Sequence, residues 1–144
     1  MTPASTPASF GLPEILFGLF PGMGAHAFLS RQLGSVAAER LITSGKTLSA
    51  QEMLALGLVH DVVPDGTGEE AVQAFIEKNA RRHAGLLGSR RAIKRSWNLS
   101  LAELTEITEI WADTALKLTE RDLKLMGRLA SKQSRAVEKV REDA

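Results

Sequence analysis

The chain has 144 residues, of which 44% are hydrophobic and 24% charged, with a formal net charge of +1 and no cysteine. This length and composition fit one globular domain and exclude a disordered or fibrous protein. The absence of cysteine excludes disulfide bonds and thiolate metal ligands, and it is compatible with a reducing compartment, so we expect a cytoplasmic protein.

The N-terminal residues 1–9 repeat the tetrapeptide TPAS. They have neither the basic start nor the apolar centre of a secretory signal, so we interpret them as a disordered leader. Residues 10–144 then form a single region, which we divide into a helical core over 10–64 and a helical C-terminal part over 65–144.

Residues 10–29, FGLPEILFGLFPGMGAHAFL, contain one charged residue, Glu14. Two prolines and four glycines interrupt the stretch, which argues against a membrane span. An ionised carboxylate among apolar residues is normally paired, neutralised or used in chemistry. Glu14 is therefore a candidate functional residue, and the alternative is a first-turn carboxylate that interacts with a helix N-terminus.

Turn and cap signals between residues 24 and 57 predict three short helices. Glycine can stop a helix in the left-handed conformation, and the spacing of Ser49 and Glu52 is that of a capping box. The residues expected at the helix ends are Gly34, Ser35, Gly45, Ser49 and Gly57.

The segment LVHDVVP, residues 58–64, is rich in β-branched residues and predicts a short strand. We then expect helices over residues 69–83 and 89–97, separated by Gly85 and Gly88. The fold class is mainly α with one or two short strands.

Ser100 and Glu103 have capping-box spacing and predict the start of a long amphipathic helix, which Thr119 restarts. The predicted elements include no sheet that could cover the apolar residues 10–29. We therefore expect another surface, from another chain or from a missing half, to cover them.

Two sequence stretches, FGLPEILFGLFPGMGA and VAAERLITSGKTLSAQEMLALGLVHDVVP, resemble the second half of the crotonase (enoyl-CoA hydratase/isomerase) superfamily. The match runs in order from Phe10 to Pro64. It implies the C-terminal helical part of the crotonase ββα-spiral α/β fold.

Within that superfamily, LFGLFPGMGA and ITEIWADTALKLTERDLKLMGRLASKQSR resemble the diffusible-signal-factor synthases, which make cis-2-unsaturated fatty acids. The resemblance implies dehydration of a 3-hydroxyacyl thioester carried on CoA or acyl carrier protein, followed by thioester hydrolysis. No further cofactor is implied. At His26-Ala27-Phe28 the chain departs from the Thr-Gln-Arg of many hydratases, which fits a lipid-handling subgroup better.

By this resemblance Glu14 is the second carboxylate of the family's acid/base pair. The first carboxylate and the two backbone N–H donors for the thioester oxygen belong to the family's first half, which this sequence lacks. We therefore expect the isolated chain to be inactive. The acyl-chain pocket of the synthase subgroup corresponds to Met23, Trp111 and Leu129, for which plain core packing is the alternative.

Seven basic residues and no acidic one lie between residues 78 and 102. They could meet CoA phosphates, an acidic carrier protein or nucleic acid, but no groove-reading motif accompanies them, so we favour a solvated face and expect no nucleic-acid partner. The three histidines have no metal-ligand spacing, and we assign no metal.

The resemblance also implies that residues 65–144 are a trimerisation-type region. It implies a homo-oligomer, either a trimer or a hexamer, or assembly with a complementary N-terminal half. Two alternatives to the synthase stay open. One is a non-catalytic, truncated helical module that self-associates, and the other is part of an ordinary enoyl-CoA hydratase/isomerase.

Overall fold

The structure, a computed structural model, describes residues 8–142, and it describes side chains as far as residue 135. The fold is mainly helical with one two-stranded sheet, which confirms the predicted fold class. The elements in chain order are β1 (Ser9–Gly11), the 3-10 helix η1 (Pro13–Phe17), α1 (Ala25–Leu33), α2 (Ser35–Ser44), β2 (Thr47–Ser49), α3 (Ala50–Ala55), α4 (Gly68–Asn79), the 3-10 helix η2 (Ala80–Arg82), α5 (His83–Trp97), α6 (Leu101–Ala115) and α7 (Glu120–Glu142).

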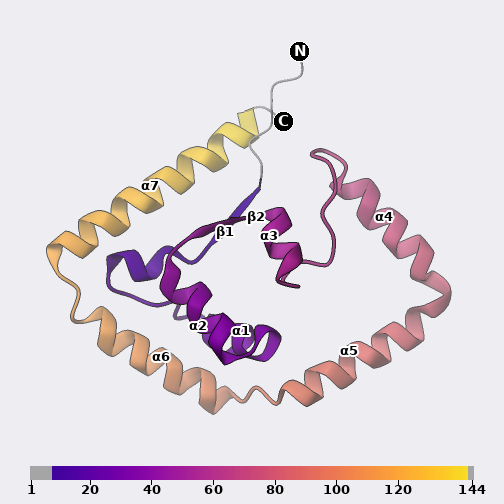
Figure 1. Ribbon diagram of the computed structural model, residues 1–144, viewed down its shortest axis with the longest axis horizontal. Coiled ribbons are helices and arrows are strands. Elements are labelled where there is room, and N and C mark those ends of the chain that lie inside the picture. Colours follow the sequence, from indigo (N-terminus) through magenta and orange to yellow (C-terminus); the bar gives the residue numbers. More distant parts are fainter. Residues whose placement is uncertain (1–7, 143–144) are drawn as a thin grey trace.

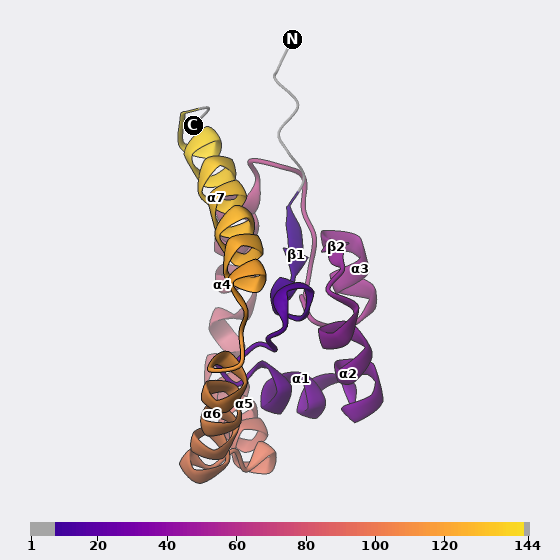
Figure 2. The same ribbon diagram turned by 90° about the vertical axis from the view of Figure 1, so that its left-hand side faces the viewer.

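These elements form a compact part and a long helical arm. The compact part runs from β1 to α3, and α4, α5, α6 and α7 surround it as an open frame (Figure 1). Seen from the side, the four arm helices form one layer and the compact part lies beside it (Figure 2). Across residues 8–142, no helix combines the length and the apolar character needed to cross a membrane.

The two strands join chain segments that are far apart in the sequence. β1 pairs with β2 in antiparallel register, with Ser9 opposite Ser49 and Gly11 opposite Thr47. The strand predicted over residues 58–64 is wrong, because that segment consists of bends and irregular backbone. β-branched residues favour a strand only where a neighbouring strand is available to pair, and β1 and β2 pair with each other.

Most predicted helix ends of the compact part are confirmed. Gly34 follows α1, and Gly45 stops α2 with a left-handed φ of 59°. Ser49 caps α3 in a complete capping box, in which the Glu52 carboxylate accepts a hydrogen bond of 2.7 Å from the Ser49 N–H. The predicted cap at Ser35 is wrong, because Ser35 is the first residue of α2 and no side chain caps that helix.

In the arm, the prediction that Gly85 and Gly88 separate two helices is wrong, because α5 begins at His83 and runs through both. A glycine inside a helix costs only about 1 kcal/mol relative to alanine, which a helix of this length tolerates. The restart at Thr119 is confirmed, since its N–H and hydroxyl donate to Asp122 Oδ2 at the start of α7 over 2.9 and 2.6 Å.

The core of the described residues lies among η1, α1 and α2, and its buried apolar side chains are Phe17, Leu19, Ala27, Ala38 and Ile42. Part of the apolar stretch is covered by the arm, since Leu118 lies over Gly18 and Trp111 over Gly22. For residues 17–22, the expectation that the cover comes from another chain or from a missing half is therefore wrong, because the arm of the same chain lies over them. Phe10, Leu16, Met23 and Phe28 remain exposed.

Candidate functional site

Glu14 lies in the first turn of η1, directly after Pro13. Its backbone oxygen accepts a hydrogen bond of 3.0 Å from the Leu19 N–H, and Gly18 ends the turn with a left-handed φ of 82°. Among the side chains described, Glu14 Oε2 is the one buried oxygen or nitrogen that has no hydrogen-bond partner. A buried carboxylate oxygen without a partner is costly, so this atom calls for a functional explanation.

The turn at residues 22–24 lies directly beneath helix α6. A β-carbon at Gly22 would lie 2.5 Å from Trp111 Cγ, and one at Gly24 would lie 3.0 Å from Leu104 Cδ2. Gly24 also has a left-handed φ of 83°. Glycine at these two positions therefore allows α6 to lie on the backbone of the turn.

The three residues assigned by resemblance to an acyl-chain pocket lie on different elements. Trp111 is half-buried over Gly22, and Leu129 is half-buried on α7. Met23, in the turn itself, is 99% exposed. The structure thus brings Trp111 to the turn that carries Met23, and the acyl-pocket assignment remains a prediction.

Sequence reasoning missed Arg31, whose guanidinium group joins three helices. It forms a bidentate ion pair with Glu103 of α6, with Nη1–Oε1 and Nη2–Oε2 distances of 2.8 and 2.7 Å. It also donates to the Trp97 backbone oxygen at the end of α5 over 2.6 Å and to the Ala27 backbone oxygen of α1 over 3.0 Å.

The hydrogen bonds of this pair affect both ionised groups. They lower the pKa of the Glu103 carboxyl group and raise the pKa of the Arg31 guanidinium. The spacing of Ser100 and Glu103 predicted a capping box, and the Ser100 hydroxyl does accept from the Glu103 N–H at 3.1 Å. The Glu103 side chain binds Arg31 instead of completing the box, and no local pattern indicated this partner 72 residues away.

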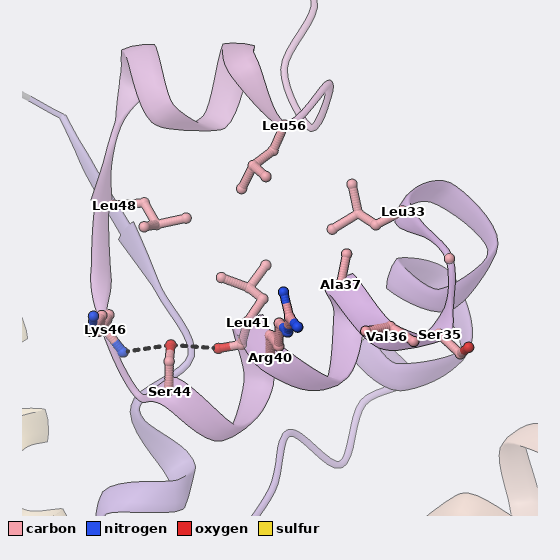
Figure 3. A pocket seen from close by; sticks show the side chains of 11 residues that line it. Leu33, Ser35, Val36, Ala37, Arg40, Leu41, Ser44, Lys46, Leu48 and Leu56 are labelled. Atoms are coloured by element: carbon pink, nitrogen blue, oxygen red, sulfur yellow. Dashed lines mark hydrogen bonds between the residues drawn. The ribbon is translucent and has the colours of Figure 1, made fainter.

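Two shallow hollows lie on the compact part. The first, of about 650 Å³, is bordered by the end of α1, by α2 and β2, and by Leu56, which follows α3. Figure 3 shows Leu33, Leu41, Leu48 and Leu56 pointing into it, with Arg40 close by. The second, of about 580 Å³, is lined by residues of β1, α1, α2, β2 and α3, by Leu12 and Leu58, and by Gln133 of α7. None of the four site residues expected from the sequence lines either hollow.

The basic side chains of α5 are all exposed, and Arg90 Nη2 lies 3.4 Å from His60 Nε2. Within the described part of the chain, no three histidine, aspartate or glutamate side chains gather in a way that could hold a metal ion. The candidate functional residues are therefore Glu14 in η1 and, as a second feature, the turn at residues 22–24 beneath α6.

Comparisons with solved structures agree with this fold. A carnitinyl-CoA hydratase from Mycobacterium avium is 31% identical with a TM-score of 0.57, and the match covers 88% of this chain and 49% of that one. An enoyl-CoA hydratase from Thermoplasma volcanium is 29% identical with a TM-score of 0.54, over 84% of this chain and 48% of that one.

Curated relatives point the same way. The 2,3-dehydroadipyl-CoA hydratase of Escherichia coli is 36% identical over 95 residues, and a protein of Rhizobium meliloti named as a probable enoyl-CoA hydratase is 40% identical over 101. The matches cover 65% and 69% of this chain but only 37% and 39% of those relatives. The sequence pattern of the Enoyl-CoA hydratase/isomerase family matches residues 1–118, and the chain belongs to this family.

Proposed function

We propose that this chain supplies the second half of an active site that adds water to, or removes water from, an acyl thioester, with Glu14 as one member of the acid/base pair. The observation that carries the proposal is the buried, unpartnered Oε2 of Glu14. Its place in the Pro-Glu motif of the family supports the same role.

The chemistry requires two proton transfers. In the dehydration direction, a proton leaves C2 of the 3-hydroxyacyl thioester and the hydroxyl on C3 leaves as water after it gains a proton. A carboxyl group within hydrogen-bond reach can perform one transfer, and a positioned acid or base typically contributes about 100- to 10,000-fold in rate. The second carboxylate and the donors for the thioester oxygen would come from the region that corresponds to the first half of the relatives.

The substrate is expected to be an acyl-CoA, with acyl carrier protein as the other carrier to test. Trp111 and Leu104 lie on the turn at residues 22–24 and offer an apolar wall beside it. Together with Met23 and Leu129, these residues would contact the acyl chain.

A Glu14→Gln variant tests this role. The chain is combined with the first half of a hydratase relative, and turnover of a 2-enoyl-CoA is measured in the completed enzyme. We expect the variant to lose about 100-fold or more in kcat. Glu39→Gln, which alters an exposed carboxylate of α2, is the matched control and should leave the rate unchanged. A wild-type rate for Glu14→Gln would refute the proposal.

A finer assignment, synthesis of a cis-2-unsaturated free acid, is supported by the resemblance of residues 107–135 to the signal-factor synthases. It adds a hydrolysis step, in which water attacks the thioester carbonyl and the thiol of the carrier leaves. Release of free acid and thiol from a 3-hydroxyacyl thioester would separate a synthase from an ordinary hydratase, which leaves the thioester intact.

Self-association is the second candidate function, and the exposed apolar side chains of the arm support it. Val72, Phe75 and Ile76 of α4 are 60%, 62% and 55% exposed. Light scattering measures the molar mass in solution, and a fluorescent dye that binds exposed apolar surface measures whether the arm is covered. A monomer that binds no such dye would contradict the proposal.

A further inference from the structure

The bidentate pair between Arg31 and Glu103 joins the compact part to the arm. The described side chains contain two ion pairs, and the other, Lys124–Glu120, lies within α7 at 3.9 Å and is largely exposed. Of these two pairs, Arg31–Glu103 is the one that connects different elements. Bidentate arginine–carboxylate pairs fix relative orientation as well as distance, because two parallel hydrogen bonds must align.

Three of the four hydrogen bonds of Arg31 restrain the start of α6. Its Nε–H holds the backbone oxygen of Trp97, the last residue of α5, and its two terminal nitrogens hold the Glu103 carboxylate in the first turn of α6. Arg31 Nη1 also donates to the Ala27 backbone oxygen, and this bond holds the guanidinium group against its own helix α1. The start of α6 is thus attached to α1 at a defined angle.

Helix α6 also carries the residues that lie on the turn at residues 22–24. Leu104 follows Glu103 directly and contacts Gly24, while Trp111, seven residues further, contacts Gly22. Seven residues correspond to about two helical turns and 10.5 Å, so Leu104 and Trp111 lie on one face of α6. If the angle between α6 and α1 changed at Glu103, the Trp111 indole would therefore move further than Leu104.

The geometry points to Arg31 and Glu103 as positioning residues, which hold α6 so that Leu104 and Trp111 form the wall of the acyl-chain site at the turn. This inference rests on the proposed function for its catalytic consequence. The structural part, the placement of Trp111, can be tested on the chain alone.

The first experiment uses the fluorescence of Trp111. The chain has two tryptophans, so a Trp97→Phe background leaves Trp111 as the reporter and retains the backbone oxygen that Arg31 binds. Arg31→Lys keeps the charge but removes the two-pronged geometry, and Glu103→Gln keeps the shape but removes the charge. We expect both to shift the Trp111 emission to longer wavelength and to increase its quenching by acrylamide, at temperatures where the protein remains folded.

Two controls separate placement from general stability. Lys124→Ala breaks the other ion pair and should leave the fluorescence of Trp111 unchanged. The double variant Arg31→Lys with Glu103→Gln should change the fluorescence no more than either single variant, because both act through one contact. Unchanged Trp111 emission and quenching in both single variants would overturn the inference.

The second experiment measures turnover in the completed enzyme described above. We expect Arg31→Lys to raise KM for a long-chain 2-enoyl-CoA about tenfold and to leave kcat within about twofold, because the variant displaces a binding wall and no proton-transfer group. A short-chain substrate should show little change. A fall in kcat with unchanged KM would overturn the assignment to the acyl chain.

The two failures can be distinguished. If Glu14→Gln retains full activity, the proposed function is wrong, yet the fluorescence of Trp111 still decides whether Arg31 and Glu103 place α6. If Glu14→Gln is inactive and the fluorescence does not respond, the catalytic proposal stands and the positioning inference is refuted.

Discussion

A methyl group added at Gly22 should push α6 away from the turn. The β-carbon of alanine would lie 2.5 Å from Trp111 Cδ1 and Cγ and 2.8 Å from Trp111 Nε1, whereas carbon atoms pack at about 3.5–4.0 Å. Trp111 Cγ is close to the helix backbone and cannot rotate away as the end of a flexible side chain could. The φ angle of Gly22 is not left-handed, so the effect of Gly22→Ala is steric.

Overpacking of this kind costs about 1–3 kcal/mol in the free energy of unfolding. We expect Gly22→Ala to lower the midpoint of urea unfolding accordingly and to expose Trp111 to acrylamide. Replacing the indole should remove the conflict, so in a Trp111→Leu background the same alanine should cost at least about 0.5 kcal/mol less.

Gly88→Ala is the matched control. Gly88 lies inside α5, its φ is not left-handed, and a β-carbon there would meet nothing within 4 Å. Alanine should therefore stabilise the helix by up to about 1 kcal/mol. If Gly22→Ala proved neutral, or if Gly88→Ala destabilised the chain equally, the contact between α6 and the turn would be refuted.

Three further predictions concern stability. Ile42→Ala should cost about 2–5 kcal/mol in urea unfolding because the side chain is 1% exposed, and a cost below 1 kcal/mol would contradict its place in the core. Gly45→Ala should cost about 1–3 kcal/mol, since φ is +59° and the β-carbon would lie 2.8 Å from a leucine side chain. Hydrogen bonds lower the pKa of Glu52, Glu103 and Asp122 below the ordinary values of 4.5, 4.5 and 3.8. The stability that these carboxylates contribute to the folded state is therefore fully present at a pH above the ordinary pKa, and it is lost as the pH falls through the lowered pKa. Acid unfolding should therefore become less steep in Glu103→Gln, and an unchanged profile would contradict this account.

Local signals predicted the ends of helices well. The helix stop at Gly45 depends on the conformation of one glycine, and the capping box of Ser49 and Glu52 depends on a spacing of three residues. Both helix ends can therefore be predicted without knowledge of the fold. Gly88 shows the limit of such reasoning, because the cost of one glycine is small enough for the rest of a helix to outweigh.

Contacts between distant residues were not readable in this way. The sheet pairs Ser9 with Ser49, and no sequence pattern at either position predicts it. The β-branched residues at 58–64, in contrast, lack a partner strand and form no strand. The Glu103 side chain could complete a local box or reach Arg31. The bidentate pair forms because Arg31 offers Glu103 two hydrogen bonds from a positively charged group, whereas the donors of a capping box are neutral.

Glu14 combines a local signal with a distant one. Its isolation in an apolar stretch was visible in the sequence, and the structure adds that Oε2 is buried without a partner. The arm also exposes large apolar side chains such as Leu101 and Leu116, which are 81% and 85% exposed. An unpartnered carboxylate and an uncovered apolar arm share one physical explanation, because a protein surface that contacts both would supply the hydrogen-bond partner and the apolar cover together. Both observations thus support the proposal that the site is completed by further polypeptide.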